Sequence, residues 1–512
     1  MLQHTGYTWC AIPPLLLLSA TANAIDVDVP NADLTRDNPA INTHIQTGFE
    51  SLRPHPLPHT QSSTPTYEID NHYLHTHPQL FHQVMQHALN SHDPNLLQAL
   101  NRAYQILPQA DEQIARRANG TLARWQGNYR QAVPIHLALQ RDFPHDSRIA
   151  LDTAATLMED KQWREAQNAF EHTQNAFRLP ETVQENVQAH LQRIVQHNQW
   201  QTSGSVSVSR QANVNRSPPS YCTPMACHAH APVKAWGVHY RVNISKNTPV
   251  WRHHNILFQS HFSGTTHFFD GKSQYDHAFG RAHLGWQYQN AKQTWRVLPF
   301  YQWQLAGSDE FEHRPVKNKT LKMNALAHAT GIQLMTTRQH SPRWASSVSA
   351  EYYRQHHRDK NQAAYHNGRY GQWALTGSFR LTPQQTILAH GGWQTFVPQH
   401  RQWAGRDNQA AYTRQSVGVA WWAHWRGLGG LHTQVQATWA QRKHKGVSLN
   451  EHFVWQKQRN RERVWQVSLA HDKWQYGGLM PQLVWSYSRT NSSHAWARRK
   501  QKQLVMEVVK TF

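Results

Sequence analysis

The last ten residues of the chain place apolar and polar side chains at alternate positions. One row is mainly apolar and ends on an aromatic residue: Leu504, Met506, Val508, Lys510 and Phe512. The other row is Gln503, Val505, Glu507, Val509 and Thr511. A period of two residues is that of a β-strand, in which successive side chains point to opposite faces of the sheet. The pattern therefore predicts a closing strand with one apolar face.

Similar alternating segments recur after residue 199, where the helical period of the preceding region stops. Clear examples are 235–245, 294–305, 372–381, 412–425 and 464–470. Short connections at 246–249, 382–384 and 427–430 alternate with long ones at 211–232, 307–320, 356–369 and 398–411. The interval 449–462 fits either a loop or a strand extension. Short turns and long loops are typical of a transmembrane antiparallel β-barrel, and we expect about fourteen strands between residues 201 and 512.

Between residues 78 and 197 the apolar positions follow a helical period, and a repeat with an offset of 34 residues is present. The matched positions pair Gly120 with Ala154, Tyr129 with Trp163, Ala132 with Ala166, and His136 with Phe170. This offset is the length of a tetratricopeptide (TPR) repeat, a unit of two packed helices. A degenerate helix starts at Asp93-Pro94, and a helix over 180–195 would close the stack. A generic helical bundle is the alternative.

A TPR stack offers a concave face built from the first helix of each repeat. In this register the face carries Arg117, Thr121, Arg124, Trp125, Arg148, Leu151, Ala155 and Met158. A groove of Arg, Trp and Met side chains suits an extended or partly unfolded polypeptide. The alternative is that these side chains are solvated or pack against neighbouring helices.

The N-terminal residues predict export. An apolar core over 11–20 precedes Ala22-Asn23-Ala24, the small-residue pattern of a signal peptide cleaved after Ala24. The first ten residues lack Lys and Arg, which departs from the usual basic start. The predicted order is a signal peptide over 1–24, a flexible Pro/His/Asn-rich tail over 25–77, a periplasmic TPR-like domain over 78–199 and an outer-membrane β-barrel over 200–512.

Composition and charge support export to a membrane. Only 39% of residues are hydrophobic and the mean hydropathy is -0.75, yet the chain carries 22 Trp, 17 Tyr and 16 Phe. A polar chain that is rich in aromatic residues suits a barrel with a polar lumen and aromatic belts. The alternative is a soluble β-protein with a basic surface. The formal net charge of +21 implies polyanionic neighbours, and export favours lipopolysaccharide over nucleic acid. Two basic clusters, at 443–461 and 498–502, are expected in long connections.

Two cysteines remain after the predicted cleavage, Cys222 and Cys227, and they lie in one short loop. In an oxidising compartment they are expected to form a local disulfide. Metal binding by the two thiols with His228 and His230 is the less favoured alternative, because their spacing is not typical of zinc. The 38 His residues are read as a compositional bias. No catalytic motif or nucleotide loop stands out, so we expect no enzyme activity, catalytic residue, cofactor or metal site.

Two stretches of the barrel region carry a family resemblance. The first runs from Gly204 through Val208 to the Asn-x-Asn pair Asn213 and Asn215. The second contains Gly477, Gly478, Pro481, Tyr487, Arg489, Asn491, Ser492, Lys510 and Phe512. Together with the signal peptide and the small TPR region, they resemble the Slam family of surface lipoprotein assembly modulators. The order Asn491-Ser492 and the cysteine pair in the first loop depart from the family pattern.

This resemblance implies an outer-membrane translocon that helps lipoproteins, or a secreted haemophore-like protein, reach the cell surface. The TPR domain would lie in the periplasm, and the barrel would be monomeric. The implied partners are the cargo protein, periplasmic chaperones, the outer membrane and lipopolysaccharide, with no nucleic acid. A polysaccharide export porin with periplasmic TPR repeats is the alternative, although such arrays tend to be longer. A passive porin or adhesin is a third possibility.

Overall fold

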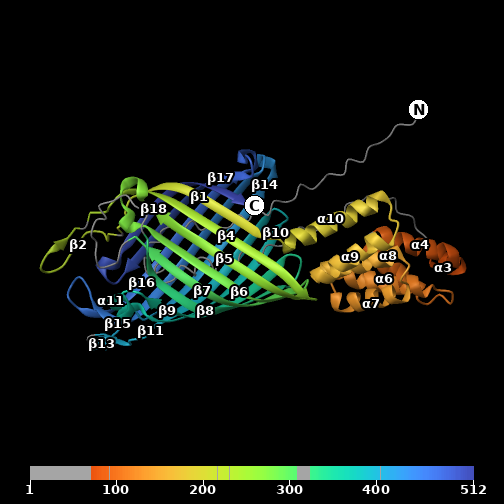
Figure 1. The fold of residues 1–512 in the computed structure, drawn as a ribbon, viewed down its shortest axis with the longest axis horizontal. Helices are drawn as coiled ribbons and strands as arrows, with labels where there is room; N and C mark the ends of the chain where they lie inside the picture. The colour runs from red at the N-terminus through yellow and green to blue at the C-terminus, as the bar shows by residue number, and fades with distance from the viewer. Residues whose placement is uncertain are drawn as a thin grey trace.

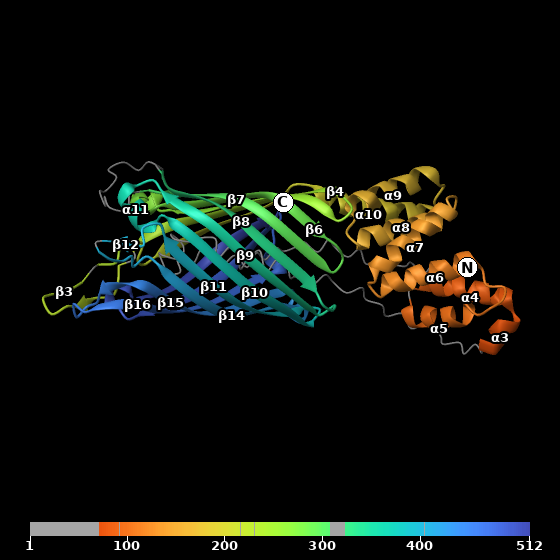
Figure 2. The same ribbon diagram turned by 90° about the horizontal axis from the view of Figure 1, so that it is seen from below.

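The computed structural model describes residues 71–91, 93–215, 217–229, 231–307, 323–403 and 405–511. A β-barrel forms one end of the molecule and a helical domain the other (Figure 1). Figure 2 shows the same arrangement from a second direction, with the helices beyond one rim of the barrel. The predicted signal peptide, most of the predicted tail and Phe512 lie outside the described residues. No helix among those residues is long and apolar enough to cross a membrane.

Fourteen antiparallel strands form a closed barrel, as the alternation predicted. Neighbouring strands follow chain order, and β1 closes the barrel against β18. The barrel strands are β1 (Gln201–Gln211), β4 (Ala235–Trp251), β5 (His254–Thr266), β6 (His277–Gln289), β7 (Gln293–Ala306), β8 (Asn324–Gln339), β9 (Trp344–His357), β10 (Gly368–Thr382), β11 (Gln385–Pro398), β14 (Tyr412–Trp425), β15 (Leu431–Leu449), β16 (Trp455–His471), β17 (Leu479–Ser492) and β18 (Arg499–Thr511). Two short hairpins lie in the long connections: β2 (Tyr221–Cys222) with β3 (Cys227–His228), and β12 (Gln402–Trp403) with β13 (Arg406–Asp407).

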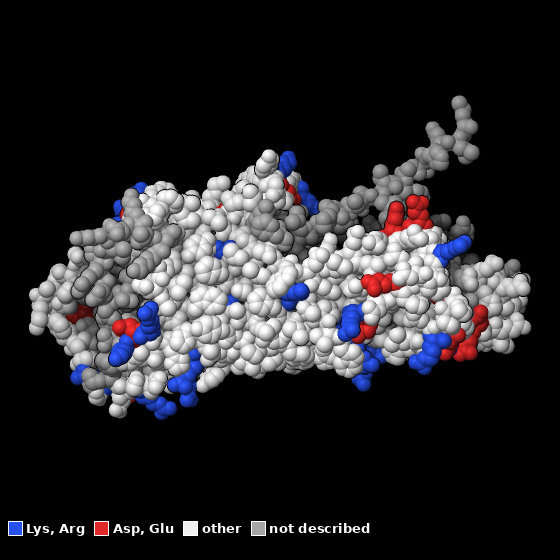
Figure 3. All heavy atoms as spheres, in the orientation of Figure 1, with Lys and Arg blue, Asp and Glu red and all other residues white. Residues whose placement is uncertain are grey.

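The strands bury polar side chains and expose apolar ones. In β1, Val206 and Val208 are 54% and 52% exposed, whereas the serines that alternate with them are buried. In β18, Leu504 and Met506 are each 61% exposed and Glu507 is buried, so the apolar row of the closing strand faces outward. This inversion is what a lipid-facing wall around a polar lumen requires. Figure 3 shows a largely uncharged barrel wall, with Lys and Arg gathered at the end away from the helices.

Exposed tryptophans mark the rim of the barrel that carries the short turns. They lie on four strands, close to the turns at 252–253, 290–292 and 340–343: Trp251, Trp286, Trp295 and Trp344. Tryptophan is favoured at a membrane–water boundary because its ring is apolar and its N–H is polar. These residues therefore place one membrane interface near the short turns, on the side of the helical domain.

Two predicted connections differ in the structure. Residues 246–249 lie inside β4, where Pro249 still pairs with Asn255, and the turn follows Trp251. The β4–β5 hairpin extends to meet the helical domain. The turn-like sequence of residues 246–249 gives no sign of this extension. The interval 449–462 is divided between a loop over 450–454 and the start of β16. The basic residues of the first cluster accordingly lie in strands rather than in a loop: Lys443, Lys445, Lys457, Arg459 and Arg461.

The first described helix of the helical domain begins at Asn71, within the segment that the sequence assigned to the tail. Leu74 in the first described helix is fully buried with Phe81, which explains why this segment belongs to the domain. The helices are α3 (Asn71–Thr76), α4 (Pro78–Ser91), α5 (Pro94–Tyr104), α6 (Glu112–Trp125), α7 (Tyr129–Asp142), α8 (Ser147–Glu159), α9 (Trp163–Ala176) and α10 (Glu181–Asn198).

The pairs α6/α7 and α8/α9 are equivalent units, as the 34-residue offset predicted. Asp111 and Asp146 begin their first helices, and each carboxylate accepts hydrogen bonds from two backbone amides. Such a cap contributes about 1 kcal/mol. Gly127 and Lys161 occupy the same turn position, with φ of 68° and 64°. Glycine adopts this left-handed conformation without strain, whereas lysine does not, so the second unit has the less favourable turn.

His136 is fully buried in α7, at the position that Phe170 occupies in the next unit. A Cβ added to Gly120 would lie 2.9 Å from Nε2 of His136, so the glycine gives the imidazole its space. Burial lowers the pKa of His136 to about 4. The folded helical domain therefore holds this ring neutral at neutral pH.

We expect the helical domain to lose stability as the pH falls from 7 towards 4. The unfolded chain binds a proton at His136 near pH 6.5 and the folded chain only near pH 4, so acid favours unfolding by about 2–3 kcal/mol. Circular dichroism at 222 nm, followed during heating, measures this in the full chain. His136→Phe, which copies Phe170, should flatten the pH dependence, and an unchanged slope would contradict the assignment.

Candidate functional site

Two ion pairs join the equivalent helices α6 and α8 of the helical domain. Arg117 Nε of α6 lies 2.7 Å from Asp152 Oδ2 of α8, and both side chains are mostly buried. Further along the same helix α6, Arg124 donates two hydrogen bonds of 2.9 Å to Glu159 of α8. The Tyr129 hydroxyl donates a third, of 3.2 Å, to the same carboxylate. Both arginines therefore join consecutive TPR units.

The other predicted groove residues divide into buried and accessible positions. Thr121 is buried, Trp125 packs against the core of the first helices, and Leu151 and Met158 pack against the core of the second unit. Arg148 is exposed, with Nε 3.6 Å from Asp152. Much of the predicted face is therefore committed to contacts between the helices.

The helical domain is attached to the barrel through the β4–β5 turn. Asp160 Oδ2 lies 2.9 Å from His253 Nε2, and the Glu165 carboxylate accepts a 2.8 Å hydrogen bond from the amide of Arg252. Arg164 donates a 2.7 Å hydrogen bond to the backbone carbonyl of Val250. Three polar contacts from the start of α9 and the turn before it thus hold one hairpin of the barrel.

Among the described residues, two buried clusters of charged side chains lie in the lumen. Arg281 of β6 makes two contacts with Glu351 of β9, at 3.0 and 3.1 Å. On the far side, Glu462 of β16 lies 2.9 Å from Arg414 Nε and 3.5 Å from Arg442 Nε. These side chains are at most 9% exposed. Buried charges of this kind are tolerated only when they are paired.

A row of aromatic rings joins the two clusters across the inner face of β7 to β14. The rings are Phe300, Tyr353, Tyr370, Phe396 and Tyr412. Neighbouring centroids lie 4.4–6.1 Å apart. The Arg281 guanidinium lies 4.0 Å from the first ring and that of Arg442 lies 4.4 Å from the last. The arginines at both ends can thus be stabilised by cation–π interactions as well as by carboxylates.

The Asn-x-Asn pair organises the first long connection. Asn213 Oδ1 accepts a hydrogen bond from the amide of Ser217, and its Nδ2 donates to the carbonyl of the same residue, both at 2.8 Å. Asn215 bonds across the connection to Ala231 and Val233. Beyond these clamps, Cys222 and Cys227 form a disulfide in the β2–β3 hairpin. His228 stacks on Tyr221 at the same place, and His230 lies outside the described residues.

The closing region combines a turn motif with a loop network. Gly477 and Gly478 have φ of 56° and 77° in the tight turn before β17. Pro481 follows inside β17, opposite Val508 of β18. At the other end of β17, Arg489 Nε donates a 2.9 Å hydrogen bond to Asn491 Oδ1. The glycines therefore fix the short turn, whereas the asparagine lies near the outer loops.

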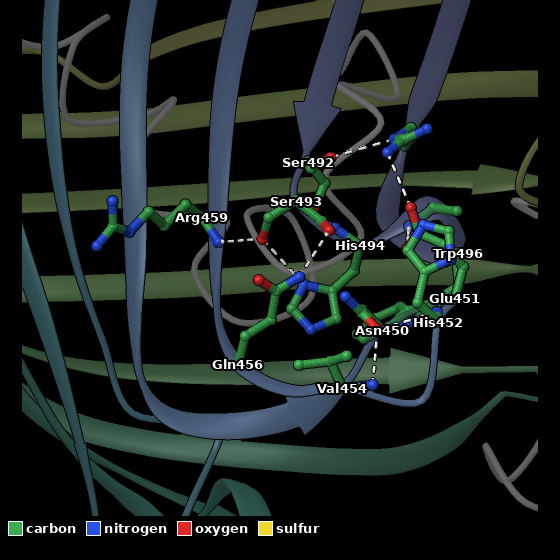
Figure 4. A network of polar contacts seen from close by, with 12 residues as sticks. Asn450, Glu451, His452, Val454, Gln456, Arg459, Ser492, Ser493, His494 and Trp496 are labelled. Carbon is green, nitrogen blue, oxygen red and sulfur yellow. Dashed lines mark hydrogen bonds and ion pairs between the residues drawn. The ribbon is translucent and has the colours of Figure 1, made fainter.

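Ser492 begins a set of hydrogen bonds that links the last two outer loops (Figure 4). Its Oγ accepts from the amide of His494, and its carbonyl accepts from Arg498 Nε. Glu451 of the preceding loop accepts from the Ala495 amide and from Arg498 Nη2. These bonds make the 450–454 and 493–498 connections one unit. Ser492, one of the residues that carried the resemblance, therefore takes part in holding these two loops together.

The fold and these sites define an outer-membrane β-barrel with an appended domain of TPR-like repeats. The family model "Surface lipoprotein assembly modifier" matches residues 200–512, and the model of the same family's N-terminal TPR repeats matches residues 67–170. The chain belongs to the surface lipoprotein assembly modifier family, as the resemblance suggested.

Curated relatives match along most of the chain. Surface lipoprotein assembly modifier 2 of Neisseria meningitidis serogroup B is 37% identical over 446 residues, which cover 85% of this chain and 87% of the relative. A surface lipoprotein assembly modifier of Pasteurella multocida is 23% identical and covers 96% of this chain and 94% of the relative.

Solved structures resemble the chain only distantly. The Pseudomonas putida toluene transporter TodX has a TM-score of 0.31 and 10% identity, with coverage of 61% of this chain and 88% of TodX. A bacterial polysaccharide outer membrane secretin has a TM-score of 0.31 and 8% identity, with coverage of 62% and 98%. Likeness at this level gives no functional argument.

Proposed function

We propose that this protein assembles lipoproteins on the cell surface by acting as their outer-membrane translocon. The observation that carries the proposal is the pair of family matches, which cover both the TPR-like domain and the barrel. The helical domain lies at the short-turn rim, which faces the periplasm in outer-membrane barrels. The client would be a lipoprotein or a related secreted protein, delivered with the help of periplasmic chaperones. No catalytic step is part of the proposal.

Surface display in a Gram-negative host without any family member tests this function. The chain is co-expressed with lipoproteins encoded beside its gene, and intact cells are labelled with antibody against each lipoprotein. We expect at least one lipoprotein to gain surface label on the order of tenfold, with unchanged total amount. Equal label with and without the chain, for every candidate, would contradict the proposal.

We also propose that the accessible part of the α6/α8 face receives the client or its chaperone. Arg148 is exposed there, whereas Arg117 and Arg124 are committed to ion pairs. A variant without all three arginines would weaken the helical stack as well as the face, so its display defect would not identify a binding role.

Arg148→Ala is therefore the sharper variant, and we expect it to lower surface display several-fold. Arg141→Ala is the matched control, because Arg141 is an exposed arginine on α7, in the second helix of the unit. Helical circular dichroism should be the same for both. Equal display by the two variants would exclude a role for Arg148 in client delivery.

The alternatives gain no specific support. The polysaccharide secretin is structurally too distant to argue for carbohydrate export. Both lumenal ion clusters in the described residues are internally paired. Passive diffusion is separated from assembly by the same display assay.

A further inference from the structure

The ladder between β1 and β18 is the shortest between neighbouring barrel strands in the described part of the chain. It pairs Ser203–Val208 with Met506–Thr511, which makes six residue pairs. The next shortest ladders, such as β1–β4 and β16–β17, pair eleven. Opening the barrel at the β1–β18 seam would therefore break the fewest backbone hydrogen bonds, each of which stabilises the closed wall.

The ladder ends on the side of the outer loops. Beyond Val208, β1 continues to Gln211 in register with β4. Beyond Met506, β18 extends in the other direction to Arg499 in register with β17. In this part of the barrel β1 still pairs with β4 and β18 still pairs with β17, although β1 and β18 no longer pair with each other. At this level Gln503 Nε2 donates a 2.8 Å hydrogen bond to Ser209 Oγ, so a side chain bridges the seam.

The edge of β18 next to this part of the seam carries basic side chains near the outer loops and apolar side chains further along. Its exposed side chains run from Lys500 and Lys502, near the outer loops, to Leu504 and Met506. An edge strand presents its amides and carbonyls in a row, and another extended chain satisfies that row by adding as a strand. The basic residues would favour an acidic segment, and the apolar ones would lie in the membrane.

We propose that the barrel opens laterally between β1 and β18, and that the β18 edge over residues 500–505 pairs with an extended segment of the client lipoprotein. This rests on the proposed function. An acyl chain drawn into a wet lumen would lose the favourable free energy of each CH₂ group that leaves the lipid. A lateral opening keeps the chains in the bilayer while the polypeptide crosses, which a closed lumen does not allow.

A disulfide across the seam tests the opening. Val208 and Met506 form the last pair of the ladder, so Val208→Cys with Met506→Cys should lock it. The matched control is Leu483→Cys with Met506→Cys, which joins β17 and β18 and shares one cysteine with the lock. Both variants are made in a Cys222→Ser, Cys227→Ser background. The client is a lipoprotein that the unaltered chain displays, and its surface display is measured before and after reduction.

We expect the oxidised lock to lower display at least tenfold and reduction to restore it, whereas the control displays normally. Normal display by the oxidised lock, with the cross-link confirmed by mass spectrometry, overturns lateral opening but leaves the translocon function intact. Failure of the unaltered chain to display any client instead contradicts the proposed function. Cross-linking of a client strand to a single Met506→Cys thiol would further support strand pairing.

A separate cluster lies at the short-turn rim. His424 at the end of β14, His432 at the start of β15 and Asp472 after β16 place one ligand atom each within 4.8 Å of the others. The Nε2 atoms of His424 and His432 lie 3.2 and 2.6 Å from different oxygens of the Asp472 carboxylate. The two imidazoles are stacked, with centroids 4.3 Å apart. Both rings thus present the same type of nitrogen to one carboxylate.

The turn is shaped around this cluster. A Cβ on Gly430 would lie only 2.1 Å from Asp472 Oδ2, and the glycine φ of 90° is unfavourable for other residues. The amide of Asp472 donates a 3.0 Å hydrogen bond to the carbonyl of Gly430. Two imidazoles and one carboxylate are a common zinc set, which leaves a fourth position for water. Tetrahedral ligands around zinc are about 3.3 Å apart, and the three ligand atoms already lie within 4.8 Å of one another, so small side-chain shifts bring them to one ion.

We infer that His424, His432 and Asp472 bind a divalent transition-metal ion such as zinc. Titration calorimetry of the full chain in detergent with zinc chloride should show one site whose affinity falls at least tenfold in Asp472→Asn. Cobalt chloride should give a tetrahedral visible spectrum that the variant loses. His471→Gln is the control, because the His471 Nε2 donates to the Leu428 carbonyl instead. Equal stoichiometry and affinity in Asp472→Asn and the control would overturn the site.

Discussion

Glu462→Ala should destabilise the barrel by about 3–5 kcal/mol. Its carboxylate lies against the guanidinium groups of Arg414 and Arg442, inside the lumen. Without it, two buried guanidinium groups face each other with no counter-charge at this position. Urea unfolding of the barrel in lipid vesicles, followed by tryptophan fluorescence, measures the loss.

Glu507→Ala supplies the comparison for this variant. Glu507 is another buried lumenal carboxylate, and it accepts a 2.7 Å hydrogen bond from the neutral amide of Gln482. Its removal should cost only about 1–2 kcal/mol, because its hydrogen-bond partner among the described residues is a neutral amide rather than a cation. Equal losses for the two variants would show that charge pairing is not what makes Glu462 important.

Arg124→Ala should destabilise the helical domain by about 2 kcal/mol. Arg124 is 16% exposed and donates two hydrogen bonds to Glu159, so the variant removes the contact between units and leaves a partly buried carboxylate. The estimate is reduced because the Glu159 side chain is 41% exposed and water screens it. The helical signal at 222 nm during urea unfolding reports the change.

A double-mutant cycle with Glu159→Ala separates the pair from other effects. The two single losses should be strongly non-additive. Arg116→Ala is the matched control, because its partner Asp142 is 46% exposed and the pair should contribute less than about 1 kcal/mol. Additive losses at Arg124 and Glu159 would mean that the two side chains act independently.

The main architecture followed from local periods in the sequence. A period of two residues predicted the barrel, and an offset of 34 residues predicted the paired helices. Even the ion pairs between units left a signal, since Arg117/Asp152 and Arg124/Glu159 are both 35 residues apart. The TPR register predicts a binding groove for both arginines, whereas the 35-residue spacing belongs to contacts between the two units.

Contacts between distant strands had no such signal. Arg281 and Glu351 are 70 residues apart, and Asp472 lies 40 and 48 residues from its two histidines. Only the closure and stagger of the barrel bring these groups together. The 246–249 segment was misread for a related reason, because its turn-like residues belong to a hairpin that extends to meet another domain.

The attachment of the helical domain has a mechanical consequence. α10 leads directly into β1, and α9 holds the β4–β5 turn, so the domain is fixed to the strands on one side of the β1–β18 seam. The domain is therefore anchored to the barrel at this rim, while its far end extends away from it. A displacement of the far end of the helices would therefore pull on β1, β4 and β5, which lie beside the shortest strand ladder of the described barrel.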